Sequence, residues 1–208
     1  AAGTDQAVIG LSGGIDSTLT SHLAVEALGP DNVYGLVMPS EVNAEANMSD
    51  AERVASDLLG IEYDVVEINP IVDAVLAASP AAEGDQLAVG NLRVRARAVL
   101  NYLAANHRDA VVLGTGNRSE ALVGYFTKYG DGAVDCHPIA NLYKAQVRQL
   151  ASHVGVPAAL AEKASSAEMW AGQTDEGEMG LSYPTLDSIL VLHVEGGMSR
   201  SATATAIG

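Results

Sequence analysis

The sequence predicts an α/β protein whose open parallel sheet carries helices on both faces, in a three-layer sandwich. Short apolar segments recur along the chain, and the first and fourth of them end in glycines, as expected of strands buried in a parallel sheet. Segments with apolar residues at helical spacing lie between them, so strands and helices alternate. The 208 residues are 48% hydrophobic, enough for one full core, and contain no repeat or linker that would divide them. We therefore expect a single domain over residues 1–208.

Four segments are expected to form the strands. The first is a continuous apolar run that ends directly before a glycine-rich turn. The third alternates apolar and polar residues, which is the side-chain period of a strand. The predicted strands are residues 7–11, 33–38, 61–68 and 109–115.

Helix start and stop signals separate these strands. Gly29 and Gly60 follow the first two predicted helices and end them. Ser49 and Glu52 have the spacing of a capping box, so the second helix is expected to begin at Ser49. The predicted helices are residues 16–28, 49–59, 71–78, 86–107, 117–125, 143–154 and 184–193, with Ser199 as the cap of one more. The apolar stripe of the long fourth helix consists of Leu92, Ala96, Val99, Leu100 and Leu103. The polar stretch 163–182 is expected to be an irregular, mobile loop.

The charge balance excludes one class of function and points to another. The chain has 26 acidic and 11 basic residues, a net charge of −15, which argues against binding to duplex DNA or RNA. An acid excess with few lysines suggests a high-salt cytoplasm, so we expect a halophilic protein. Because an acidic surface needs no cations, the three lysines are either anion-binding groups or part of ordinary solvated helix faces. They are Lys128, Lys144 and Lys163.

Other features bear on where the protein works. The single cysteine, Cys136, excludes a disulfide within the chain and cysteine-rich zinc sites. No run of about 18 apolar residues exists, so no transmembrane helix is expected. The N-terminus lacks the basic start and the long apolar stretch of a signal peptide. These features predict a soluble, cytoplasmic protein with no membrane partner.

The strongest local motif is SGGIDS, residues 12–17, which follows the first predicted strand and opens a helix. Its glycines let backbone N–H groups turn toward an anion, and the helix N-terminus favours negative charge. Asp16 would repel a phosphate unless a divalent cation lay between them, so the motif suggests a magnesium-bound polyphosphate. The structural alternative is a tight turn in which Asp16 only caps the helix. The motif is not a Walker A loop, because no G-K-[ST] follows.

A second polar motif, GTGNRSE, ends the fourth predicted strand at residues 114–120. Because ligands bind beyond the carboxyl ends of parallel strands, Asp16 and Glu120 are expected to meet there. Two carboxylates next to a polyphosphate would form a magnesium site. Taken alone, Glu120 fits better as an ordinary acid in the first turn of a helix.

SGGIDS resembles the pyrophosphate loop of ATP pyrophosphatases, which split ATP to AMP and pyrophosphate. Further motifs make residues 7–195 similar to the ammonia-dependent NAD synthetases within that superfamily. These motifs are PSE at 39–41, GNLRVRAR at 90–97, GTGNRSE at 114–120, GYFTKYGDGAVD at 124–135, GQTDE at 172–176 and the turn LSY at 181–183. The resemblance implies an adenine-nucleotide α-hydrolase-like, Rossmann-like fold and a homodimer.

The resemblance also implies roles for the matching residues. Those expected to bind ATP are Gly10, Leu11, Ser12, Gly13, Gly14, Ile15, Asp16, Ser17, Thr115, Lys144 and Ser166. Those expected to bind nicotinic acid adenine dinucleotide (deamido-NAD) are Arg95, Lys128 and Asp135. Asp16 and Glu120 would hold Mg²⁺, and Asp16, Glu120 and Lys144 would take part in catalysis.

Two arguments from the residues accompany this assignment. Arg93 and Arg97 share a helix face, whereas Arg95 points elsewhere, so we expect a site role for Arg95 and surface roles for its neighbours. Lys144 begins a predicted helix, where the dipole disfavours a cation. A lysine in that place is better explained if it faces a phosphate.

The implied activity is that of an amide-forming ligase. The substrate carboxylate attacks the α-phosphate of ATP, pyrophosphate leaves, and ammonia converts the adenylated intermediate to NAD and AMP. Cys136 has no glutaminase-type partners nearby, and the length leaves no room for a glutaminase domain, so free ammonia is the expected donor. A separate glutaminase partner stays open. Two alternatives remain: another pyrophosphate-loop enzyme, GMP synthetase-like or tRNA-modifying, and a nucleotide-binding module without catalysis.

One departure from the family concerns the end of the chain. The family carries a His-Lys pair in its C-terminal tail that reaches the dinucleotide, whereas this sequence ends in TAIG at residues 205–208. A C-terminal tail is therefore expected to be missing, which affects the dinucleotide site more than the ATP site.

Overall fold

The computed structural model describes residues 3–208 and is built on a parallel sheet of four strands. The strands are β1 (Ala7–Leu11), β2 (Val33–Val37), β3 (Glu62–Val65) and β4 (Val111–Leu113), in the order β3-β2-β1-β4. The chain runs outward from β1 to β3 and then returns to the other side of β1 as β4. The boundary between β1 and β4 is therefore the topological switch point, where ligands bind in open α/β sheets.

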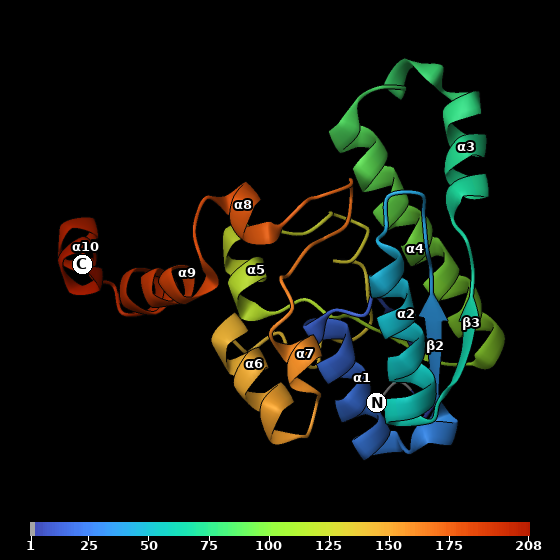
Figure 1. Cartoon of the computed structure of the whole chain (residues 1–208), viewed down its shortest axis with the longest axis horizontal. Coiled ribbons are helices and arrows are strands. Elements are labelled where there is room, and N and C mark those ends of the chain that lie inside the picture. The colour runs from blue at the N-terminus through green and yellow to red at the C-terminus, as the bar shows by residue number, and fades with distance from the viewer. Residues whose placement is uncertain (1–2) are drawn as a thin grey trace.

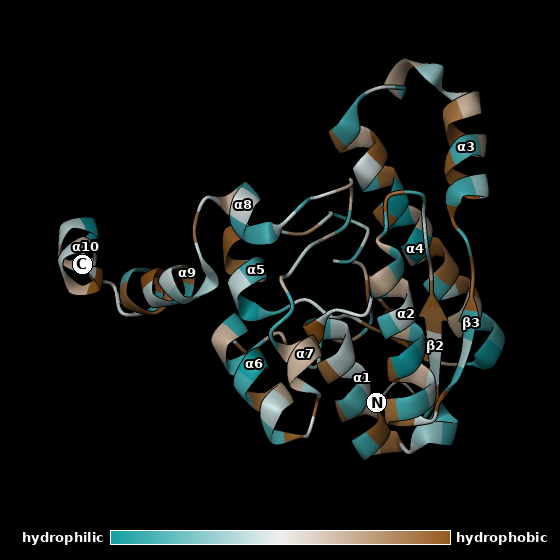
Figure 2. Ribbon diagram, in the orientation of Figure 1, coloured by the Kyte–Doolittle hydropathy of each residue, from teal (hydrophilic) through white to brown (hydrophobic). Residues whose placement is uncertain are grey.

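Two apolar cores lie on opposite faces of this sheet. Val8 and Ile9 are both fully buried, but Val8 packs toward one core and Ile9 toward the other. On the Ile9 side lie α1 (Ile15–Leu28), α2 (Glu45–Arg53) and the π-helical segment Val54–Leu59 that continues α2. On the Val8 side lie α3 (Asn69–Ala78) and α4 (Gln86–Arg108). Figure 2 shows the apolar strand β2 in this central layer. The predicted three-layer α/β fold is confirmed.

The second half of the chain extends the molecule beyond the sheet. Its helices are α5 (Arg118–Val123), α6 (Lys144–His153), α7 (Ala158–Ala161), α8 (Asp175–Met179), α9 (Tyr183–Ile189), which continues as the π-helical segment Leu190–Glu195, and α10 (Arg200–Ile207). A third core joins α6 to α1, because Val147 and Ala151 pack against Ile15 and Leu19. Figure 1 shows α9 and α10 extending away from the sheet.

Several helix boundaries differ from those expected. The capping box predicted at Ser49 is wrong, because α2 begins at Glu45 and places Ser49 inside the helix. The extra turn has a tertiary cause: Asn47 donates a hydrogen bond to Glu168, and its backbone packs directly on Gly13. The stretch 163–182, expected to be irregular, contains α8, whose first turn is capped by Thr174. Ser199 caps α10 as predicted.

The long helix α4 buries only part of its predicted apolar stripe. Ala96 is buried, and Leu92 and Leu100 pack against the core on the Val8 side of the sheet. Val99 and Leu103 are each 64% exposed, so their assignment to the core-facing stripe was wrong. They lie on the outer side of the helix, away from the sheet. Within residues 3–208, no helix is both long and apolar enough to cross a membrane.

Candidate active site

The glycine-rich loop after β1 is fixed by its own hydrogen bonds. The hydroxyl of Ser12 accepts a hydrogen bond from the backbone N–H of Gly14 at 3.2 Å and lies 3.1 Å from the hydroxyl of Ser17. Gly13 has a φ of +71°, and a Cβ there would lie 2.3 Å from the carbonyl oxygen of Asn47 on α2. Only glycine fits this place. The loop is therefore shaped before any ligand binds.

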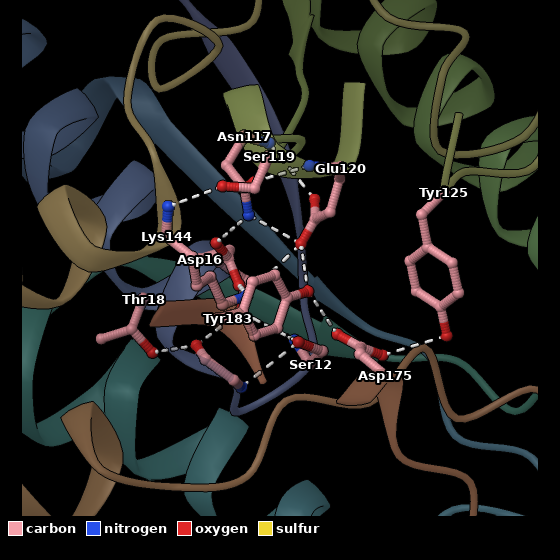
Figure 3. A network of polar contacts seen from close by, with 12 residues as sticks. Ser12, Asp16, Thr18, Asn117, Ser119, Glu120, Tyr125, Lys144, Asp175 and Tyr183 are labelled. Carbon is pink, nitrogen blue, oxygen red and sulfur yellow. Dashed lines mark hydrogen bonds and ion pairs between the residues drawn. The ribbon is translucent and has the colours of Figure 1, made fainter. Parts of the chain in front are cut away.

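A buried lysine joins the two carboxylates that the sequence predicted to meet. The Nζ atom of Lys144 lies 2.5 Å from Oδ2 of Asp16 and 3.3 Å from Oε1 of Glu120, and its side chain is 1% exposed (Figure 3). Asp16 follows β1, whereas Glu120 follows β4. The prediction that these residues converge is confirmed, and the place is the switch point of the sheet.

Asn117 holds the two carboxylates from the other side. Its amide nitrogen donates to Oδ1 of Asp16 at 3.0 Å and to Oε1 of Glu120 at 2.6 Å (Figure 3). Asn117 is also the N-cap of α5, and its side-chain oxygen accepts from the backbone N–H of Glu120 at 3.1 Å. The carboxylate of Glu120 in turn accepts a hydrogen bond from the backbone N–H of Asn117, which completes a capping box. Glu120 is thus both a first-turn acid and part of the site.

The cluster carries more negative than positive charge. Burial and the nearby Asp16 raise the pKa of Glu120 to about 7, although Lys144 and the Asn117 N–H oppose this shift. Burial alone would lower the pKa of Lys144, but Asp16 and Glu120 outweigh it and the pKa is raised. The lysine therefore stays protonated. A second cation near Glu120 would favour the ionised form of its carboxyl group.

These two carboxylates fit a magnesium ion that also binds phosphate. No group of three or more potential ligands from His, Cys, Asp and Glu occurs in the described part of the chain, residues 3–208. Mg²⁺ does not require such a group, because it keeps several waters and commonly takes one or two carboxylates together with substrate phosphates. Asp16 and Glu120 supply that pair beside the glycine-rich loop.

Sequence reasoning gave no role to two residues that complete this cluster. The hydroxyl of Tyr183, on α9, donates to Asp175 at 2.9 Å and to Glu120 at 3.3 Å. The ammonium of Lys144 lies 4.7 Å from the centre of the Tyr183 ring. Asp175 is buried, which raises its pKa, and also accepts from Tyr125 at 3.2 Å (Figure 3). The signal lay in the motifs GQTDE and LSY, which contain Asp175 and Tyr183.

The loop opens into a cleft of about 460 Å³, a size suited to a small organic ligand. Most of the predicted ATP-binding residues line it: Gly10, Leu11, Ser12, Gly14, Ile15, Asp16, Ser17, Thr115, and Ser166, joined by Glu120. Gly13 does not line the cleft and faces α2 instead. Lys144 does not line the cleft but lies behind Asp16 and Glu120, which do, and contacts both.

The residues expected to bind the dinucleotide lie outside this cleft. The Nε atom of Arg95 donates to the carbonyl oxygen of Lys128 at 3.2 Å. Asp135 accepts from the hydroxyl of Tyr102 at 3.1 Å and from the N–H of Val112 at 2.8 Å. Arg95 and Tyr102 line a shallow hollow on the outer side of α4. The structure therefore brings the three residues near one hollow, which adjoins the loop cleft, because Ala98 and Ala133 line both.

The surface roles expected for Arg93 and Arg97 are wrong. Arg97 lines the cleft and donates to the carbonyl oxygen of Met38 at 3.1 Å and to Asn43 at 3.0 Å. Burial and the nearby Arg93 lower its pKa to about 10, which leaves it charged at neutral pH. Arg93 is buried and donates to the carbonyl oxygen of Met169 at 3.1 Å. The face of α4 that carries Arg93 and Arg97 is covered by loops, and the two arginines supply hydrogen-bond donors to backbone carbonyl groups of those loops.

A parallel sheet whose switch point carries a glycine-rich loop, a buried lysine and paired carboxylates defines an α/β nucleotide-binding enzyme. Comparison with known proteins gives the family. A family model described as NAD synthase matches residues 1–206, and the chain belongs to this family.

Relatives in curated collections support this membership. The NH(3)-dependent NAD(+) synthetase of Halobacterium salinarum is 62% identical over 205 residues, which cover 99% of this chain and 76% of the relative. The enzyme of the same name from Archaeoglobus fulgidus is 51% identical and matches 93% of this chain and 78% of its own length.

Solved structures agree in fold. The NMN synthetase of Francisella tularensis superposes with a TM-score of 0.86 at 38% identity, covering 99% of this chain and 82% of that one. The NH3-dependent NAD synthetase of Campylobacter jejuni, solved with a nitrate ion, superposes with a TM-score of 0.74 at 34% identity, covering 98% and 82% of the two chains.

Proposed function

We propose that this protein catalyses the ATP-dependent amidation of nicotinic acid adenine dinucleotide with ammonia, which gives NAD, AMP and pyrophosphate. It is thus an ATP-using ligase of NAD biosynthesis. The observation that carries the proposal is the contact of Lys144 with both Asp16 and Glu120 directly beside the glycine-rich loop. The 62% identity to an NH(3)-dependent NAD(+) synthetase supports the same reaction.

The polyphosphate of ATP would bind at the loop after β1. The first N–H groups of α1 have no partner within the helix and favour an anion, and Ser12 and Ser17 add hydroxyl donors. Thr115 and Ser166 line the same cleft from β4 and from the segment before α8. The cleft therefore offers polar groups on more than one side of a nucleotide.

Asp16 and Glu120 would hold the magnesium ion. When bound, the ion would neutralise charge on the leaving pyrophosphate. Lys144 adds a fixed ammonium charge beside the same carboxylates, and Asn117 keeps their orientation. Because these groups are in place before the reaction, they need little reorganisation in the transition state.

The reaction needs no covalent bond to the protein. The substrate carboxylate forms a bond to the α-phosphorus of ATP, the bond to the bridging oxygen breaks, and pyrophosphate leaves. Ammonia then forms a bond to the activated carbonyl carbon, AMP leaves, and the nitrogen loses a proton. Positioning and electrostatic stabilisation would supply the rate.

The dinucleotide and the second subunit would meet on the outer side of α4. Arg95, Lys128 and Asp135 lie around the shallow hollow there. Val99 and Leu103, beside Arg95 in the same hollow, are exposed apolar residues of the kind that subunit interfaces cover. We therefore propose a homodimer whose interface includes this face and borders the substrate site.

A substrate-dependent exchange assay tests the function. Labelled pyrophosphate should enter ATP only when Mg²⁺ and nicotinic acid adenine dinucleotide are both present, and ammonia should then yield NAD. The TM-score of 0.86 to an NMN synthetase makes nicotinic acid mononucleotide the second candidate substrate. If the mononucleotide supports faster exchange than the dinucleotide, the substrate assignment changes. If neither does, a nucleotide-binding module without catalysis replaces the ligase.

A further inference from the structure

Lys163 lies at the rim of the glycine-rich loop and has no role in the reaction described so far. Its Nζ atom lies 2.7 Å from Oδ2 of Asp50 on α2 and 3.4 Å from the carbonyl oxygen of Gly13. Its side chain is 24% exposed and lines the cleft. It precedes Ser166, which lines the same cleft, by three residues.

We propose that Lys163 is a further ATP-binding residue, which contacts the phosphates held on the glycine-rich loop and exchanges its ion pair with Asp50 for that contact. This inference rests on the proposed function, because it requires ATP at the loop. All three lysines of the chain would then bind a ligand, and Asp50 would be the partner of Lys163 in the ATP-free protein.

The position of Lys163 supports this contact. Its ammonium touches the carbonyl of Gly13, within the loop whose N–H groups would hold the phosphates. A lysine side chain is a compact charge on a flexible stem with three donors, so it can reach a phosphate nearby without moving the backbone.

The pair with Asp50 is weak enough to exchange. Both side chains are 24% exposed, and ion pairs in contact with solvent contribute little stability. A polyphosphate inside the cleft carries more charge than one carboxylate. Asp50 also has a second cation, since Arg53 lies 3.6 Å away on the solvent side of α2. The carboxylate therefore keeps a partner when Lys163 leaves.

A purely structural role makes a different prediction. If the ion pair only held the segment before α8 against α2, then Lys163→Met and Asp50→Asn would change the affinity for MgATP equally, because each substitution breaks the ion pair. If Lys163 binds phosphate, the two substitutions should have opposite signs. Losing the ammonium weakens ATP binding, whereas losing the carboxylate frees the ammonium and removes a negative charge near the phosphates.

Titration of the full chain with MgATP and with AMP separates these cases. For Lys163→Met we expect the Kd of MgATP to rise about tenfold, as for loss of one charged hydrogen bond, with the Kd of AMP unchanged. Asp50→Asn should bind MgATP at least as tightly as the unmodified protein. Lys163→Arg should restore part of the affinity. Arg53→Met is the matched control, since Arg53 is 70% exposed, contacts the same carboxylate and does not line the cleft.

Three results would count against the proposal or its basis. Unchanged MgATP binding by Lys163→Met overturns the phosphate contact. An equal loss of MgATP affinity in Lys163→Met and Asp50→Asn also overturns it, and shows that the ion pair only holds two segments together. An unmodified protein that binds no MgATP overturns the proposed function itself, which distinguishes that failure from the other two.

Discussion

The ammonium of Lys144 lies 2.5 Å from the carboxylate of Asp16, although 128 residues separate them in the sequence. Asp16 lies in the first turn of α1, directly after β1, whereas Lys144 begins α6, which follows α5 and a long loop. The packing of α6 against α1 brings the two residues together. A buried cation beside two carboxylates is costly unless each group is paired. Because Asn117 and Tyr183 complete the pairing, the site is ordered before any ligand arrives.

Asp16→Asn should abolish the release of pyrophosphate. The amide has the shape of the carboxylate, but it removes the charge that pairs with Lys144 and would hold Mg²⁺. Pyrophosphate release with MgATP, the dinucleotide and ammonia measures the effect, and Asp31→Asn on the exposed surface is the control. Normal turnover by Asp16→Asn would show that the metal assignment is wrong.

Lys144→Met should destabilise the protein in a way that Mg²⁺ partly repairs. The substitution leaves Asp16 and Glu120 close together with no ammonium, and breaking a buried pair typically costs about 3–5 kcal/mol of the free energy of unfolding. A divalent cation can replace the lost charge, so Mg²⁺ should raise the melting temperature more in the variant than in the unmodified protein.

Thermal unfolding with Mg²⁺ and with EDTA, at constant KCl concentration, checks this expectation for Lys144→Met. Catalysis should remain lost even when stability returns, because the ammonium also belongs to the reaction site. An equal rise in melting temperature for both proteins would contradict a magnesium site at Asp16 and Glu120.

Sequence patterns predicted the residues of this site that follow strands, but not those placed by loops or by the packing of helices. Asp16 and Glu120 were predictable, because a glycine-rich turn after an apolar strand fixes where each acid must lie in a parallel sheet. Arg97 was not, because helical spacing gives the angle between side chains but not which face the loops cover. Tyr183 reaches Glu120 only through the packing of α9 against the body, which no local pattern encodes.

The pH dependence of stability should reveal the raised pKa of Asp131, a solvent-exposed residue at the edge of the cleft. Partial desolvation at the cleft raises its pKa, although backbone N–H groups oppose the shift, including that of Thr127, which donates to Asp131 at 2.7 Å. The folded protein therefore binds this proton more tightly than the unfolded chain, and the free energy of unfolding falls as pH rises from the unfolded pKa of about 4 through the raised folded pKa.

Asp131→Asn keeps an acceptor for Thr127 and removes the partly desolvated charge. The variant should be more stable than the unmodified protein at pH 7, and the difference should shrink as pH falls toward 4. Chemical denaturation at several pH values measures the difference in the free energy of unfolding. A difference that does not change with pH would mean that Asp131 has an ordinary pKa.

The oligomeric state should depend on the exposed apolar residues of α4. Val99 and Leu103 are each 64% exposed and line the hollow beside Arg95, so a second copy that covers this face would bury them. Leu103→Asp would place a charge in that interface and should convert the dimer to a monomer, because an unpaired buried charge is strongly unfavourable. Val65→Asp is the matched control, since Val65 is 51% exposed but lies on β3 outside the hollow.

Light scattering after gel filtration gives the mass of each protein. If Leu103→Asp has the same mass as the unmodified protein, the dimer does not use this face. If it becomes a monomer and loses affinity for the dinucleotide but not for MgATP, the interface and the hollow around Arg95 belong to one site.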